Sequence, residues 1–208
     1  MSTADLALRA FVTFFVVVDP VGLSPMFLGI AGRRDAADRS RVARNAVLVA
    51  LGILLAFAFG GAWLLGQLGI SLDAFRVAGG ILLFRIAVDM VFAHPERGTE
   101  EEAAEARERR DIAVFPLAIP LIAGPGALAS AMILAGEARG NPTALAVVVG
   151  MIVLVLGMTW AAFAASTGIA RVLGQTGVNV ITRVGGILLA ALAAQYVGDG
   201  LRALLFPA

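Results

Sequence analysis

The fold is decided by two short stretches, Asp19-Pro20-Val21-Gly22-Leu23-Ser24-Pro25 and Gly124-Pro125-Gly126-Ala127, each of which interrupts a long apolar run. Proline removes a backbone donor, clashes with the preceding helical turn and disfavours helical backbone in the residue before it. An Asp or Ser before proline also matches a helix N-cap followed by a proline at the first helical position. The two stretches therefore predict two apolar helices broken near their middles, with new half-helices over 20–31 and 125–136.

Apolar runs surround these breaks and account for most of the 208 residues. The chain is 60% hydrophobic and 15% charged, whereas a soluble domain carries about 25% charge. A membrane-spanning helix needs about 20 apolar residues, and in lipid every backbone polar group must be satisfied within the segment. We therefore predict an all-α polytopic membrane protein with six transmembrane helices, over 6–31, 44–66, 72–92, 112–136, 143–170 and 178–206.

The chain repeats itself. Besides the two proline stretches, the sequence of 65–72 returns at 173–180, and Gly-Gly-Ile-Leu-Leu at 79–83 returns at 185–189. Three helices in each half force the second half to cross the membrane upside down, an arrangement typical of transporters. We predict a first three-helix repeat over 1–93, a charged loop over 94–111 and a second, inverted repeat over 112–208.

Arginine placement predicts the orientation of the bundle. All 16 basic residues are arginine, and they concentrate in three connections, 33–44, 94–111 and 170–178, that lie on one side of a six-helix chain. Because Lys and Arg in short loops favour the cytoplasmic side, we expect the 33–44 and 94–111 loops in the cytoplasm and both termini outside. The expected location is the cell (inner) membrane.

The sequence lacks the residues that several classes of chemistry require. The chain has no cysteine, which excludes disulfides, thiol catalysis and Cys-ligated zinc, and its single histidine, His94, cannot build a triad or a His-based metal site. No nucleotide-binding motif is present to power a pump, and no basic patch stands apart from the loops to bind nucleic acid. We predict no enzymatic activity, no cofactor, no metal and no nucleic-acid partner.

The broken helices predict a binding site at the membrane midplane. Half-helix N-termini attract a carboxylate, while unwound carbonyls coordinate a cation. Asp19 is the deepest acid, and its cost in lipid favours a functional role as the coupling site, although a purely structural cap is an alternative. The predicted substrate-binding residues are Asp19, Pro20, Gly22, Ser24, Gly124, Pro125, Gly126 and, on the last helix, Gln195.

At these residues the sequence resembles the MarC family, also called UPF0056-type membrane proteins. That family opens with Asn-Pro-x-Gly-x-x-Pro-x-Phe, which here reads as Asp19 to Phe27. Its central motif Ile-Pro-Leu-x-Ala-Gly-Pro-Gly-Ala stands at Ile119 to Ala127, and its Arg-x-x-Gly-Gly-Ile-Leu-Leu segment at Arg76 to Leu83. A Gln-aromatic-x-x-Asp-Gly ending appears at Gln195 to Gly200.

The resemblance implies a function. It implies transport or export of small neutral amino acids such as alanine, glycine, serine or threonine, coupled to a proton or to sodium. The chain departs from the family pattern at Asp19, where Asn is usual, and an acid at this place would change substrate choice or ion coupling.

Two hypotheses for the function remain. The first is a secondary transporter in the lipid bilayer that alternates access around the two broken helices. The alternative is a non-transporting membrane scaffold or regulator that acts through the 94–111 loop. Deleting that loop should abolish the function of a scaffold, whereas a transporter would tolerate the deletion.

Overall fold

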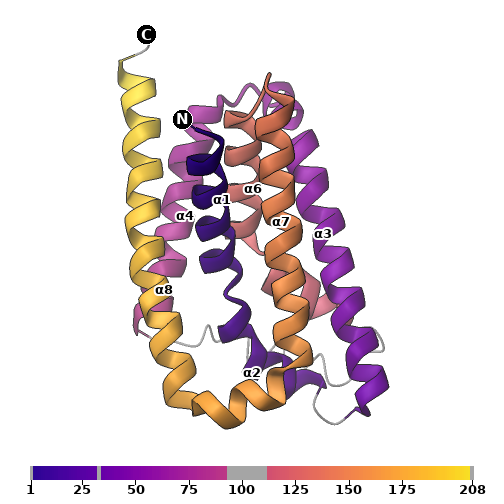
Figure 1. Cartoon of the computed structure of the whole chain (residues 1–208). Helices are drawn as coiled ribbons and strands as arrows, with labels where there is room; N and C mark the ends of the chain where they lie inside the picture. Colours follow the sequence, from indigo (N-terminus) through magenta and orange to yellow (C-terminus); the bar gives the residue numbers. More distant parts are fainter. Residues whose placement is uncertain (1, 32–33, 93–111, 207–208) are drawn as a thin grey trace.

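The computed structural model describes residues 2–31, 34–92 and 112–206, which form a helical bundle without any strand in these ranges (Figure 1). The first half contains α1 (Thr3–Val18), α2 (Pro20–Ala31), α3 (Ala36–Gln67) and α4 (Leu72–Phe92). The second half contains η1 (Ala113–Ile122), α6 (Pro125–Glu137), α7 (Pro142–Ala164) and α8 (Ser166–Leu205). The all-α prediction is confirmed for the described residues. The charged 94–111 loop lies outside them.

Polar residues start several of these helices. The Ser2 hydroxyl accepts a hydrogen bond from the Asp5 N–H, and the Asp5 carboxylate accepts one from the Ser2 N–H, so α1 begins with a capping box. Asp35 caps α3 and Asn141 caps α7, each by accepting from the N–H three residues later. Local sequence thus fixes where each of these helices begins.

One predicted loop is helical instead. Most of the predicted 33–44 connection is the first part of α3, which begins at Ala36. Its charged residues suggest a loop by composition, although arginine favours helices. The predicted 170–178 connection coincides with a kink in α8, where Gly174 has φ 60° and ψ −179° and separates two helical stretches.

The number of membrane crossings is confirmed only in part. Four segments are long and apolar enough to cross a membrane, namely Thr3–Ala31, Ala36–Gln67, Pro142–Ala164 and Ser166–Leu205, and the bent pair η1–α6 would make a fifth. The remaining helix, α4, has 21 residues, or about 31 Å at 1.5 Å per residue, and therefore has the length to cross. Its charged residues, Asp73, Arg76, Arg85 and Asp89, are spread along the helix, so that α4 lacks the long stretch almost free of charge that each apolar span contains.

Helix α4 packs closely along the C-terminal part of α8, after the kink at Gly174 (Figure 1). A methyl group on Gly80 would lie 2.9 Å from the Ala193 carbonyl oxygen, and one on Gly186 would lie 3.0 Å from the Ala87 carbonyl oxygen. The contact is antiparallel and reciprocal, because positions 80 and 186, like positions 87 and 193, are 106 residues apart. Glycine is required at both places for the backbones to approach.

The broken helices lie in the interior of the bundle. Helices α3 and α7 pack on each other, and each also packs on the broken segment of the opposite half, α3 on η1 and α7 on α1. The half-helices also pack on the opposite half of the chain. Helix α2 contacts α7 and α8, whereas α6 contacts α3 and α4. Phe14, Leu54, Leu117 and Ile152 are almost completely buried in the core that these contacts form.

Candidate functional site

The first break is a single residue. Asp19 has left-handed backbone geometry, with φ 46° and ψ 67°, and its N–H still donates to the Phe15 carbonyl oxygen to complete α1. Its carboxylate Oδ1 accepts a hydrogen bond of 3.0 Å from the N–H of Gly22. Asp19 therefore ends α1 and caps the start of α2 at Pro20, where the sequence predicted a half-helix.

The second carboxylate oxygen of Asp19 bonds to a residue that the sequence analysis did not select. The Thr182 hydroxyl, on α8, donates to Asp19 Oδ2 over 2.8 Å. The signal for Thr182 was present in the repeat, because it stands three residues before Gly185, as Arg76 stands three before Gly79. Thr182 ties the broken helix of the first half to the last helix of the second.

Gly22 and Ser24 complete this group. A methyl group at position 22 would overlap the Asp19 carboxylate and lie 2.7 Å from the Thr182 hydroxyl oxygen. The fully buried Ser24 hydroxyl contacts the Pro20 carbonyl oxygen at 2.9 Å and the Ala162 carbonyl oxygen, on α7, at 3.4 Å. The predicted residues Asp19, Pro20, Gly22 and Ser24 are thus one compact unit with its polar groups bonded.

The second break spans Ala123 and Gly124, and its helix start lacks a side-chain cap of the kind that Asp19 provides. The chain bends by 60° between η1 and α6, and Gly124 is the N-cap of α6 with Pro125 at the first helical position. Among the described residues, no side chain caps the first turn of α6, so its first N–H groups have no side-chain partner. Gly126 and Ala127 are buried, and apolar side chains of α1 and α4 pack against Gly126.

The two breaks lie close together. A methyl group on Gly126 would lie 3.1 Å from the Val17 side chain, in the last turn of α1, and 2.9 and 3.0 Å from Ile86 and Leu83 of α4. Leu83 and Ile86 stand near the middle of α4, so the start of α6 is level with the centre of that helix. Both breaks that the sequence predicts are present, and they adjoin each other across apolar side chains.

Gln195 is not part of this arrangement. Its side chain is exposed and donates a hydrogen bond of 2.8 Å to Asp199, one turn further along α8. It stands 13 residues after Thr182 (195 − 182), which is about 20 Å along a helix. Of the eight predicted substrate-binding residues, seven therefore line the two breaks and Gln195 lies elsewhere.

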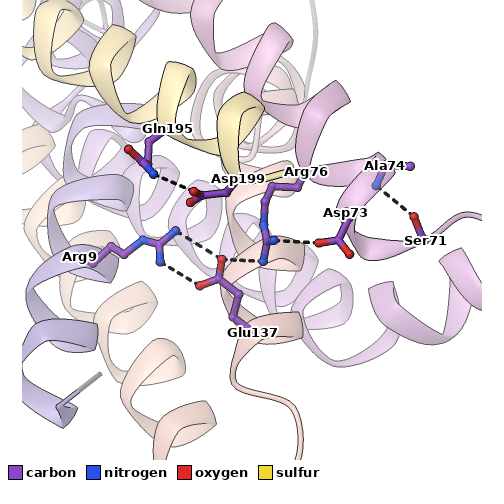
Figure 2. A network of polar contacts seen from close by, with 8 residues as sticks. All are labelled: Arg9, Ser71, Asp73, Ala74, Arg76, Glu137, Gln195 and Asp199. Carbon is purple, nitrogen blue, oxygen red and sulfur yellow. Dashed lines mark hydrogen bonds and ion pairs between the residues drawn. The ribbon is translucent and has the colours of Figure 1, made fainter. Parts of the chain in front are cut away.

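An ion-pair network joins three helices near Gln195 (Figure 2). Arg9 of α1 forms two hydrogen bonds to the Glu137 carboxylate, at 3.1 and 3.3 Å. Arg76 of α4 donates to the same carboxylate at 3.0 Å and to Asp73 at 2.8 Å. This network could not be predicted from the sequence because its members are far apart in the chain and Glu137 belongs to no motif.

The opposite end of the described bundle is hollowed. A cleft of about 140 Å³ opens between α2, α3, α7 and the start of α8, and its lining includes Phe27, Arg39, Trp160, Phe163 and Ser166. The rings of Phe27 and Phe163 stack with centroids 4.4 Å apart. Within the described ranges, no group of three or more His, Asp or Glu side chains is arranged to hold a metal ion.

Comparison with known proteins agrees with this architecture. The pattern of the MarC family of integral membrane proteins matches residues 5–205. A UPF0056 membrane protein of Methanocaldococcus jannaschii is 38% identical over 197 residues, which cover 94% of this chain and 96% of that protein. The UPF0056 membrane protein YvbG of Bacillus subtilis is 38% identical over 202 residues, with coverage of 96% and 95%. YhcE of Escherichia coli is 36% identical over 201 residues, with coverage of 96% and 93%. No solved structure matches the chain.

Proposed function

Because the chain belongs to the MarC family of integral membrane proteins, we propose that it is a secondary transporter of small neutral amino acids that alternates access around its two broken helices. The observation that carries the proposal is the meeting of the two breaks inside the bundle, where Val17 contacts the first turn of α6 at Gly126. Interrupted backbone is tolerated at membrane depth only where protein or a water-filled cavity surrounds it.

The two breaks offer complementary groups to a zwitterion. The first turn of α6 has no side-chain cap, and helix N-termini favour a carboxylate through their N–H groups and dipole. Asp19 supplies the opposite charge, and a carboxylate has about four lone-pair sites, so the bonds from Gly22 and Thr182 leave sites for an ammonium group or a proton. Asp19 is the proposed coupling residue, with a proton as the coupling ion.

The proposal includes six crossings arranged as two inverted repeats. The reciprocal contact of Gly80 and Gly186 supports it, as does the cross-packing of α3 on η1 and α7 on α1. The charge of Arg76 fits a crossing helix because it pairs with Asp73 and Glu137. The proposed location is the cell (inner) membrane with both termini outside.

Transport of alanine into proteoliposomes, with and without an imposed pH gradient, tests the proposal. We expect Asp19→Ala to abolish transport, because it removes both the cap of α2 and the bond to Thr182. Asp19→Asn keeps an oxygen that accepts from Gly22 but cannot carry a proton, so this variant should still exchange alanine and lose its response to the pH gradient.

A matched control is Asp38→Asn, which removes an exposed carboxylate from α3 and should transport normally. The transporter proposal fails if purified wild-type protein moves no small neutral amino acid, or if Asp19→Ala transports alanine as fast as wild type. Deletion of 94–111 separates it from the scaffold alternative, because transport should survive that deletion.

A further inference from the structure

The network around Glu137 closes one end of the bundle. Arg9 and Arg76 belong to the first half of the chain and Glu137 to the second, so the ion pairs tie the halves together (Figure 2). The side chains of Glu137 and Arg76 are only 17% and 15% exposed, so solvent screens these pairs less than surface pairs. At the other end, the described residues form the cleft beside Phe27 and Ser166.

Glu137 occupies an unfavourable place for an acid. It is the last residue of α6, and the C-terminal end of a helix carries partial negative charge that repels a carboxylate. Its position therefore depends on the two arginines, which surround it as protein arginines surround a bound carboxylate. The Glu137 carboxylate therefore lies where the two arginines would bind the carboxylate of a ligand.

Buried polar groups adjoin the network. Tyr196 is fully buried, its hydroxyl interacts with Thr13, and the Arg9 guanidinium lies 5.3 Å from the centre of its ring. Arg76 Nε is buried and has no hydrogen-bond partner among the described residues. Buried polar groups are nearly always bonded, so Arg76 Nε leaves room beside the network for the acceptor of a polar ligand or water.

The repeat provides an independent comparison. Arg76 and Thr182 hold equivalent places, three residues before Gly79 and Gly185, and each donates to a carboxylate of a broken segment. Arg76 is charged and is joined by Arg9 at Glu137, whereas Thr182 is a neutral donor to Asp19. Charge-assisted bonds between two ionised groups are stronger than those with a neutral donor, so the end at Glu137 is the more firmly closed.

We propose that Arg9 and Arg76 form a carboxylate-binding site on the outer side of the pathway, which Glu137 occupies and closes in this structure. The inference rests on the proposed transport of amino acids. When the outer end opens, Glu137 leaves and the carboxylate of the transported amino acid takes its place on the two guanidinium groups.

Accessibility of Thr13 tests the closure. Thr13 is 1% exposed and lies one turn below Arg9 on the same face of α1, so a reagent from outside must pass the Arg9–Glu137 pair to reach it. The natural chain has no cysteine, so Thr13→Cys gives a single reactive thiol. We expect an impermeant charged maleimide to label it slowly, and at least tenfold faster when Glu137→Gln is added.

Controls separate opening from misfolding. Asp38→Asn breaks an exposed ion pair on α3 and should leave the labelling rate unchanged. Glu137→Asp keeps the charge and should restore slow labelling. Each variant is first checked for a single symmetric peak in size-exclusion chromatography. Equal labelling rates with and without the Glu137→Gln substitution overturn the closure.

Protection from labelling tests the ligand. In the Thr13→Cys, Glu137→Gln protein, alanine should slow labelling and alaninamide, which lacks the carboxylate, should not. Adding Arg76→Gln should remove the protection. Equal protection by both compounds overturns the carboxylate site. If wild-type protein transports alanine but Glu137→Gln leaves labelling unchanged, only this inference fails. If labelling behaves as expected but no amino acid is transported, the proposed function fails.

Discussion

Asp19 ends α1, caps the start of α2 and accepts a hydrogen bond from Thr182. Its left-handed backbone costs about 1 kcal/mol or more for a residue other than glycine. Its side chain offsets that cost by capping α2 at Gly22, which is worth about 0.5–2 kcal/mol, and by bonding to Thr182. The sequence offered a coupling role and a capping role as alternatives, and the geometry shows the cap directly. The coupling role stays a prediction, compatible with the cap.

Gly22 tests how tightly the carboxylate is held. Gly22→Ala would place a methyl group into the Asp19 carboxylate, so we expect a loss of about 1–3 kcal/mol of stability and loss of alanine transport. Gly29→Ala, on the same helix, meets no atom of the described residues within 4 Å and should gain up to about 1 kcal/mol, because alanine favours helix over glycine. Thermal unfolding in detergent measures both. An equal response of the two variants contradicts this account of the site.

Glycine allows the backbones of α4 and α8 to come into close contact. Their contact needs a backbone without a side chain at Gly80 and Gly186, since in each case the neighbouring atoms include a carbonyl oxygen of the facing helix. In lipid, helices gain little from burying apolar side chains against each other, so association depends on close packing of this kind. The equivalence of the two contacts makes the two glycines equally important.

Substitution at these glycines should therefore have matched effects. Gly80→Ala and Gly186→Ala should each destabilise the protein by about 1–3 kcal/mol, because a carbonyl oxygen in a helix cannot move aside as a side chain can. Gly198→Ala, on α8, is the control because it meets no atom within 4 Å. Unfolding midpoints in detergent provide the measurement. A large loss for one glycine and none for the other would show that the contact is not reciprocal.

Features set by proline, glycine and the length of an apolar run could be predicted from the sequence. Features set by contacts between residues far apart in the chain could not. The breaks at Asp19 and Gly124 follow from the proline motifs, and α2 and α6 begin at the predicted prolines. Helix α3 starts earlier than expected because Asp35 caps a charged segment that local composition describes as loop. Thr182 and Glu137 act through partners 163 and 128 residues away, a separation that no local pattern encodes.

At the scale of the whole molecule, the first turn of α1 and the last turn of α8 lie at the same end of the bundle (Figure 1). Chain ends on one side require an even number of crossings. Four helical spans and the bent pair η1–α6 make at most five, so α4 decides the outcome. Arg76 pairs with Asp73 and Glu137, which lowers the cost of placing these charges within the bundle.

Labelling from each side of the membrane determines the count. Ala4→Cys and Phe206→Cys, both exposed, should react with an impermeant maleimide added to intact cells, whereas Ala37→Cys at the start of α3 should react only after the membrane is opened. This pattern follows from the arginine bias of the loops. Labelling of the two ends from opposite sides would give an odd number of crossings and contradict the inverted repeat.

The reciprocal contact between α4 and α8 has a mechanical consequence. The same backbone approach occurs on both sides of its centre, at Gly80 and at Gly186. In the proposed transporter, a small tilt of one half about that centre would widen one end of the bundle and narrow the opposite end. The two glycine–carbonyl contacts would then form the pivot that keeps the interior from facing both sides of the membrane at once.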